Sequence, residues 1–171
     1  MTELSLATLA NLAEIIGAGS IITGLIFGAI QIKHYRRKQM DTVAANLTQT
    51  FYSRQLAEAL AILQPLPDGI SLQELRDLGP DYTEAAITVT TSFETMGLLV
   101  FKRIAPLELV LDLAGGVVTT MSRKLKRWQE DVRSEQQQPS WGEWFEWLGD
   151  QAGKMKSNTS PAHIRHRDWK P

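Results

Sequence analysis

The sequence predicts an all-α protein in which one N-terminal transmembrane helix continues into a small cytoplasmic helical bundle. Three observations carry this prediction. An uncharged apolar run extends from Ile15 to Ile32, a basic stretch at 33–38 follows it directly, and apolar residues further along recur every three or four positions. That spacing places one apolar stripe along an amphipathic helix.

The apolar run is long enough to cross a membrane. Its 18 residues rise about 27 Å as an α-helix, which approaches the ~30 Å hydrocarbon thickness of a bilayer. It lacks the polar face that a surface helix of a soluble protein shows, although a buried core helix remains the first alternative. A cleaved signal peptide is the second alternative, but its positive charge should precede the apolar core, where this chain has Glu3 and Glu14.

Basic residues set the expected orientation. Lys33, Arg36, Arg37 and Lys38 follow the apolar run, and no basic residue precedes it. The positive-inside rule therefore places the N-terminus outside the cell inner (plasma) membrane and the C-terminal domain in the cytoplasm. We expect the same four side chains to anchor the helix to membrane lipid headgroups.

These features predict five segments along the chain. The predicted segments are an extracytoplasmic N-terminus (1–12), a transmembrane helix (13–32), a basic anchor (33–38), a cytoplasmic helical domain (39–153) and a disordered tail (154–171). The domain is long enough to enclose its own core, and the tail is polar and unpatterned.

Small residues recur along one side of the predicted transmembrane helix. Ser20, Gly24 and Gly28 lie four residues apart, a spacing that lets two helix backbones approach closely in lipid. We predict that they pack against a second copy or another membrane protein. The alternative is that glycine is simply frequent in membrane helices.

The first two elements of the domain are marked by apolar spacing and by a cap. Apolar residues from Met40 to Leu63 follow a helical period with one slip, so the first helix is predicted to run on until Pro65. Ser71-Leu72-Gln73-Glu74 is a capping-box pattern that predicts a short helix before Gly79-Pro80.

Two longer helices are expected next. A stripe from Ala86 to Val100 predicts a core-facing helix, although the β-branched stretch Thr88–Thr91 locally favours a strand. Another helix begins near Pro106, and Gly115-Gly116 marks a kink or a close helix crossing within it. A second membrane span over 98–121 is rejected, because it would hold four charged side chains: Lys102, Arg103, Glu108 and Asp112.

The last predicted helix is rich in tryptophan. After a polar linker that ends at Pro139, Ser140 opens a helix that places Trp141, Trp144 and Phe145 on one face together with Leu148. Exposed aromatic residues often mark a contact with a membrane or a partner, so the first three form a candidate partner surface. Packing against the preceding helices in the core is the other interpretation, and the sequence favours it.

Nothing in the sequence points to catalysis, and we expect no catalytic residues, no cofactor and no metal. The chain has no cysteine, and its histidines, His34, His163 and His166, lie outside the predicted domain. Three carboxylates lie on or near apolar helices: Glu94, Glu108 and Asp112. We expect them on a solvated or salt-bridged face, with Lys102 and Arg103 as the candidate partners, and a buried pair able to do acid–base work is the alternative. A net charge of −1 gives no reason to expect nucleic-acid binding.

One N-terminal span, a basic flank, Phe93-Glu94 with Gly97, and Trp141 to Leu148 after Pro139 together form a recognisable layout. This layout resembles a bacterial family of small single-pass membrane proteins known only as a domain of unknown function. The resemblance supports the topology and a plasma-membrane location, and it implies no activity.

The sequence therefore predicts a non-enzymatic, single-pass membrane protein whose helical domain is an interaction or assembly module, with a homodimer as one form. The alternative is an accessory subunit of a membrane channel or transporter complex.

Overall fold

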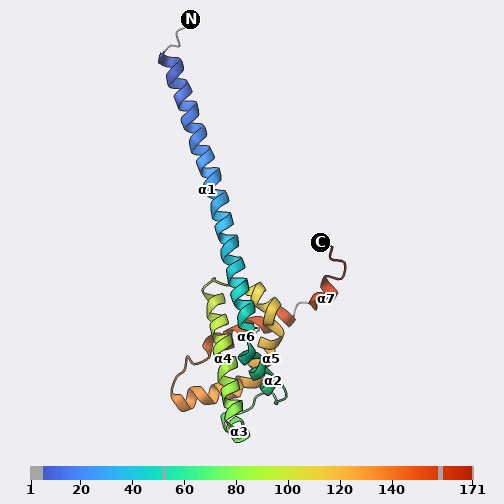
Figure 1. Ribbon diagram of the computed structural model, residues 1–171. Coiled ribbons are helices and arrows are strands. Elements are labelled where there is room, and N and C mark those ends of the chain that lie inside the picture. Colours follow the sequence, from blue (N-terminus) through green and yellow to red (C-terminus); the bar gives the residue numbers. More distant parts are fainter. Residues whose placement is uncertain (1–5, 52, 158–159, 171) are drawn as a thin grey trace. The chain divides into compact units, whose positions relative to one another are not determined.

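The computed structural model describes residues 6–51, 53–157 and 160–170 (Figure 1). Every regular element in these ranges is a helix, which confirms the all-α fold. The chain divides into two units, with the boundary between Thr42 and Val43.

The first unit consists of one helix. Helix α1 spans Leu6–Phe51 without a break, so the predicted membrane helix does continue beyond the basic stretch. Its last turns already belong to the second unit, where Leu47 is buried and Phe51 packs against the core.

A single helix up to Leu63 is a wrong prediction. Helix α1 ends at Phe51, and α2 (Arg54–Leu63) begins separately. Ser53 has an extended backbone, and its hydroxyl accepts a hydrogen bond from the backbone N–H of Leu56 at 3.3 Å. This N-cap satisfies a backbone donor that α2 would otherwise leave unpaired, and it accounts for the slip in the apolar spacing.

Helix α3 (Leu72–Leu78) confirms the predicted capping box. The Ser71 hydroxyl accepts from the Glu74 N–H, and the Glu74 carboxylate accepts from the Ser71 N–H at 2.8 Å. The loop before α3 is hydrogen-bonded to α5, because the N–H groups of Gly69 and Ile70 both donate to the Lys124 carbonyl.

Helices α4 (Pro80–Phe101) and α5 (Leu107–Gln136) supply most of the core. The stretch Thr88–Thr91, which locally favours a strand, is helical. The Thr91 hydroxyl donates to the Ile87 carbonyl one turn earlier at 2.9 Å. The predicted core stripe of α4 is buried throughout: Ala86, Val89, Phe93, Met96 and Val100.

Helix α6 (Glu143–Ser157) packs against both α4 and α5. It begins at Glu143 and not at the predicted Ser140, because Gly142 takes a left-handed backbone with φ +69°. The pair Gly115-Gly116 lies inside a continuous α5, where a β-carbon at Gly115 would lie 3.3 Å from the end of the Lys156 side chain of α6.

The end of the chain keeps some helical structure. In the described part of 154–171, where a disordered tail is predicted, α6 continues to Ser157 and a four-residue helix, α7, spans Ala162–Arg165. The Lys156 side chain, near the end of α6, lies over the two glycines of α5.

Candidate functional site: an apolar span and an aromatic cluster

Helix α1 contains a stretch long and apolar enough to cross a membrane. Residues Glu14–Tyr35 form 22 residues of helix with a mean hydropathy of 2.0. At ~1.5 Å per residue this stretch is about 33 Å long, which exceeds the ~30 Å hydrocarbon core of a bilayer. A helix that stands alone in its unit has nothing to bury its apolar side chains, and those of Ile21, Leu25 and Phe27 are 61–70% exposed.

The serine and threonine hydroxyls inside this stretch donate hydrogen bonds to the helix backbone. Ser20 Oγ donates to the Ile16 carbonyl at 2.8 Å, and Thr23 Oγ1 donates to the Gly19 carbonyl at 2.8 Å. Intrahelical pairing of this kind removes the cost of placing a hydroxyl in hydrocarbon. The span can therefore enter lipid without an unsatisfied hydroxyl at either position.

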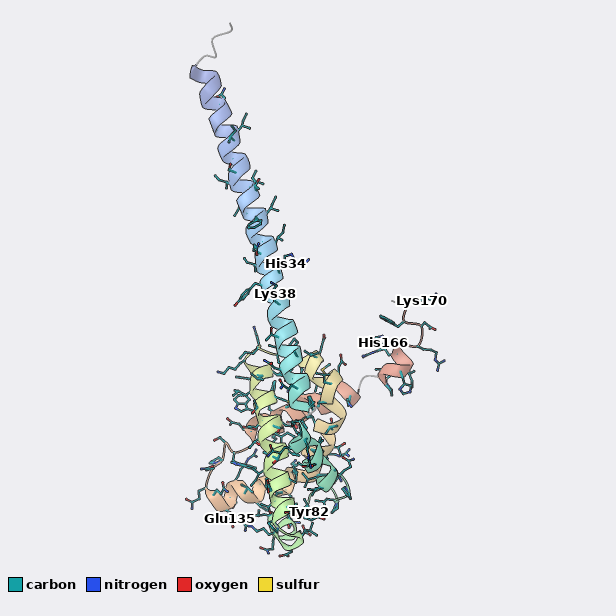
Figure 2. The ribbon with its side chains drawn as sticks, viewed as in Figure 1. His34, Lys38, Tyr82, Glu135, His166 and Lys170 are labelled. Atoms are coloured by element: carbon teal, nitrogen blue, oxygen red, sulfur yellow. The ribbon has the colours of Figure 1, made fainter. Side chains whose placement is uncertain are left out.

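The predicted basic anchor follows on the same helix. The side chains of Lys33 and Lys38 are exposed, and Figure 2 shows Lys38 one helical turn beyond His34. Arg36 and Arg37 lie on α1 as well, but their side chains are outside the described part of the structure. The helix thus carries Lys33 and Lys38 into the zone where a bilayer would end.

The predicted packing residues lie on an open side of α1. A β-carbon added at Gly24 or Gly28 would meet no atom within 4 Å, and Ser20 is exposed. The stripe is therefore accessible to another helix. Its packing role stays a prediction.

The three residues of the candidate partner surface have different environments. Phe145 is fully buried, with its ring 5.3 Å from that of Phe93. Trp141 lies in the turn before α6 and meets Trp128 edge-on at 5.1 Å. Trp144 is half-buried, and its ring is 4.4 Å from the half-exposed Phe101.

Aromatic side chains reach the surface next to Trp144. Phe101, Trp144 and Trp147 form an aromatic cluster in which the Phe101 and Trp147 rings are 5.9 Å apart. Phe101 and Trp147 were not predicted as part of a surface. A signal was present, because Phe101 precedes Lys102 and Arg103 at the end of an apolar stripe, where an aromatic ring beside basic residues often lies at an interface.

Glu94 holds the aromatic helix in place. Its carboxylate accepts a hydrogen bond from the backbone N–H of Phe145 at 2.8 Å, in the first turn of α6, where partial positive charge gathers. Burial raises the pKa of Glu94, and the N–H groups of Phe145 and Trp144 oppose that rise. The predicted pairing of Glu94 with Lys102 and Arg103 is wrong, because a helix N-terminus takes the place of the cation.

The other two carboxylates lie on a solvated face, as the sequence allows. Glu108 and Asp112 are exposed, and within the described ranges neither forms an ion pair with Lys102 or Arg103. Exposed charges are solvated by water, so they need no partner. Lys102 instead lies over the Phe101 ring, with Nζ 6.0 Å from the ring centre.

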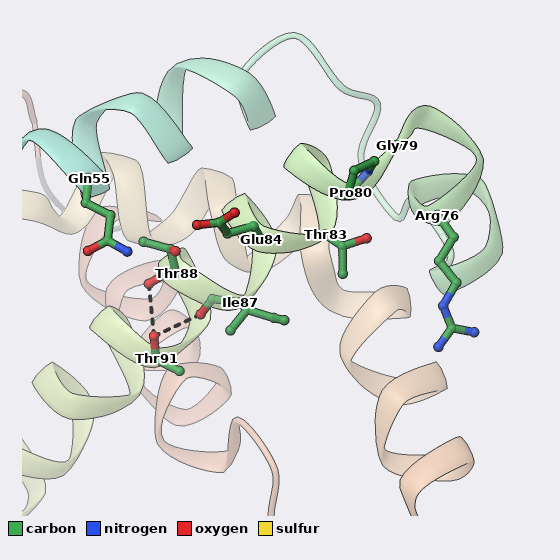
Figure 3. Close-up of a pocket in the computed structure, with 9 residues that line it drawn as sticks. All are labelled: Gln55, Arg76, Gly79, Pro80, Thr83, Glu84, Ile87, Thr88 and Thr91. Carbon is green, nitrogen blue, oxygen red and sulfur yellow. Dashed lines mark hydrogen bonds between the residues drawn. The ribbon is translucent and has the colours of Figure 1, made fainter.

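A groove of about 760 Å³ lies along α4 where it faces α2 and α3 (Figure 3). Its one guanidinium is already engaged, since Arg76 is bound by Glu135 through two hydrogen bonds of 2.9 and 2.7 Å. Five further polar residues line it: Gln55, Thr83, Glu84, Thr88 and Thr91. No three histidine, cysteine, aspartate or glutamate side chains gather into a metal site anywhere in the described ranges.

Most of the chain matches a known family. The model of a family described as a domain of unknown function, DUF4760, matches residues 18–151, from within the apolar stretch of α1 into α6. This confirms the expected resemblance to a family known only as a domain of unknown function. No curated protein and no solved structure matches the chain.

Proposed function

The chain belongs to the DUF4760 family, a family of unknown function, and on that premise we propose that it is a non-enzymatic single-pass membrane protein. Its helical unit would act as an interaction or assembly module held at the membrane. The observation that carries the proposal is the apolar helix Glu14–Tyr35, which runs directly into a unit with a core of its own.

The charge distribution supports one orientation. Lys33, Arg36, Arg37 and Lys38 follow the apolar helix, and the N-terminal flank has no basic residue. By the positive-inside rule, the N-terminus lies outside the plasma membrane and the helical unit lies in the cytoplasm. Residues 39–153 contain neither histidine nor cysteine, two side chains that often act as general base or nucleophile, and this supports a non-catalytic role.

Single-cysteine labelling of the full chain tests the membrane placement. Because the chain contains no cysteine, Thr2→Cys and Ser134→Cys each create a unique thiol on opposite sides of the span. In intact cells or right-side-out vesicles, an impermeant maleimide should label the thiol at position 2 and should reach position 134 only after the membrane is opened. Alkaline carbonate should leave both variants in the membrane pellet.

Three results would refute this placement. Release of the full chain by carbonate would remove the membrane span, and labelling of position 134 alone in sealed vesicles would invert the orientation. An N-terminus missing from the mature chain would identify the apolar stretch as a cleaved signal peptide.

The assembly role is tested by mass after mild solubilisation. A discrete homodimer supports the interaction module, in line with the accessible stripe at Ser20, Gly24 and Gly28. Co-purification of other membrane proteins in fixed ratio supports the alternative, an accessory subunit of a channel or transporter. A lone monomer at all concentrations would contradict both.

A further inference from the structure

The turn between α4 and α5 exposes apolar and basic side chains side by side. Leu98, Phe101 and Ile104 are 38%, 50% and 47% exposed. Lys102 and Arg103 between them are exposed too, and neither forms an ion pair with any residue of the described ranges. The turn therefore combines uncovered apolar surface with two available positive charges.

The backbone of this turn is fixed in one shape. The N–H of Ile104 donates to the Leu99 carbonyl and the N–H of Arg103 to the Val100 carbonyl, both at 2.9 Å, which is the Schellman pattern. Arg103 occupies the left-handed position of this motif with φ 57°, where glycine is the residue of lowest strain. Arg103 thus occupies a backbone conformation that is unfavourable for any residue with a side chain. Strained residues of this kind are often found at functional sites.

The turn lies at the end of the second unit where the chain enters from α1. The Phe51 and Phe93 rings are 6.3 Å apart, and Figure 1 shows the last turns of α1 and helix α4 running in opposite directions. Val43 lies eight residues before Phe51, and Phe101 lies eight residues after Phe93. Equal steps along antiparallel helices bring Val43 and Phe101 to the same level.

Chain length limits how far this end can be from the end of the apolar stretch. Tyr35 and Val43 are eight residues apart, and eight residues reach at most about 28 Å even when fully extended. A helical path of that length covers only about 12 Å. Any membrane that holds Glu14–Tyr35 therefore lies within reach of the entry end of the helical unit.

We propose that the α4–α5 turn is a second membrane contact, with Phe101 and Ile104 inserted at the headgroup level and Lys102 and Arg103 bound to anionic headgroups. The aromatic cluster of Phe101, Trp144 and Trp147 extends this apolar surface from the turn onto α6. Rings, aliphatic side chains and basic tips in one place match the chemistry of the membrane–water interface. This proposal rests on the proposed membrane span.

Lipid quenching of a probe on the full chain tests the contact. Ile104→Cys and the control Leu78→Cys each carry an environment-sensitive fluorophore, and both positions are 47% exposed in the structure. They lie beyond opposite ends of α4, whose 22 residues separate them by about 33 Å. In vesicles with anionic lipid, the probe at 104 should shift to the blue and be quenched by lipids brominated near the headgroup, and the probe at 78 should do neither.

A third probe separates this proposal from the one on which it rests. Leu25→Cys, in the middle of the apolar stretch, should be quenched by lipids brominated deep in the acyl chain. If position 25 is quenched and position 104 behaves like position 78, the second contact is refuted and the span stands. If position 25 is not quenched, the single-pass proposal fails first. A blue shift at 104 without lipid quenching means that protein covers the turn, which also refutes a lipid contact.

Charge removal tests the role of the two cations. Lys102→Gln with Arg103→Gln should lower the ratio of lipid-contacting to water-exposed probe at 104 on anionic vesicles, by roughly fivefold for each charge removed. On neutral vesicles the same change should have no effect. An equal loss on both lipids would contradict headgroup binding by Lys102 and Arg103, and circular dichroism confirms that each variant is folded.

Discussion

At the residue scale, Glu94 joins two helices that sequence alone does not place together. Its carboxylate lies at the first turn of α6 and accepts from the Phe145 N–H, while Phe93 next to it packs on the Phe145 ring. One dipeptide therefore supplies a polar and an apolar contact to the same helix start. A charged acceptor at a helix N-terminus also interacts favourably with the helix dipole.

Stability should depend on pH through Glu94. Burial raises the pKa of Glu94 in the folded chain, so the folded state binds this proton more tightly than the unfolded state. As the pH falls from neutral toward the ordinary glutamate value of about 4.3, the folded state gains stability from this group. We expect the free energy of unfolding of the natural chain to rise relative to that of Glu94→Gln over this window.

The measurement is denaturant unfolding of both chains at several pH values between about 4.3 and 7. Taking the difference between the two chains cancels the contributions of all other titrating groups. A difference that stays constant with pH, or that falls as the solution becomes more acidic, would contradict the raised pKa of Glu94 and show that its contacts with the N-terminus of α6 outweigh its burial.

Gly97 permits the closest approach of α4 and α6. A β-carbon there would lie 2.2 Å from the Trp144 carbonyl oxygen and 2.7 Å from its carbonyl carbon. Both atoms are backbone, so the helices must separate to admit even alanine. We expect Gly97→Ala to lower the free energy of unfolding by about 1–3 kcal/mol.

Gly153 supplies the matched control for that substitution. It lies within α6, and a β-carbon there would meet nothing within 4 Å. Gly153→Ala should therefore raise stability by about 0.5–1 kcal/mol through helix propensity alone. If denaturant unfolding shows that both alanine variants change the free energy of unfolding in the same direction, crowding of α4 and α6 does not explain the effect at Gly97.

At the scale of the element, the end of α4 keeps a strained residue. Arg103 has φ 57° and completes the Schellman motif, in which a side chain crowds the following carbonyl. Arg103→Gly should raise the free energy of unfolding by about 1 kcal/mol. The control is Lys102→Gly, where φ is −74°, because glycine gains nothing there and costs about 0.5–1 kcal/mol. Thermal unfolding that ranks the two in the opposite order would contradict strain at Arg103.

Helix α1 carries a prediction of its own. Isoleucine at Gly24 and Gly28 would fill the stripe that they share with Ser20, so Gly24→Ile with Gly28→Ile should abolish self-association in a membrane-helix reporter assay. Ala18→Ile with Ala29→Ile adds similar bulk to the other side of the helix and should leave association intact. Unchanged association in the glycine variant would refute the packing role.

At the scale of the whole molecule, the sequence predicted whatever depends on local spacing. The apolar stretch of α1, the capping box at Ser71 and the buried stripe of α4 all follow from residues close together in the chain. The break at Ser53 was missed because one hydrogen bond to Leu56 decides it, and a serine outside such a geometry carries no signal.

Contacts between distant residues account for what the sequence left open. Glu94 and Phe145 are 51 positions apart, so no period or motif links them before the fold does. The same holds for Phe101 and Trp144, whose contact divides the tryptophan-rich helix into a buried part and a surface part. Composition identified these aromatic residues, and only packing shows which of them reach the surface.

The division into two units predicts that heating removes only part of the helical signal. In mild detergent, the second unit should unfold cooperatively, because its helices share one core around Phe93, Trp128 and Phe145. The apolar part of α1 should stay helical, since its backbone groups have no water with which to exchange hydrogen bonds inside a micelle. Circular dichroism of the full chain should therefore show one transition followed by a residual helical signal.

A core substitution distinguishes the two contributions. Phe93→Ala removes a fully buried ring and should destabilise the second unit by about 3–5 kcal/mol, which lowers the temperature of the transition. The residual signal after the transition should be unchanged, because residues 14–35 make no part of that core. If heating the natural chain removes all helical signal in one step, the helix of the first unit depends on the second, and the proposed independence of the membrane segment is wrong.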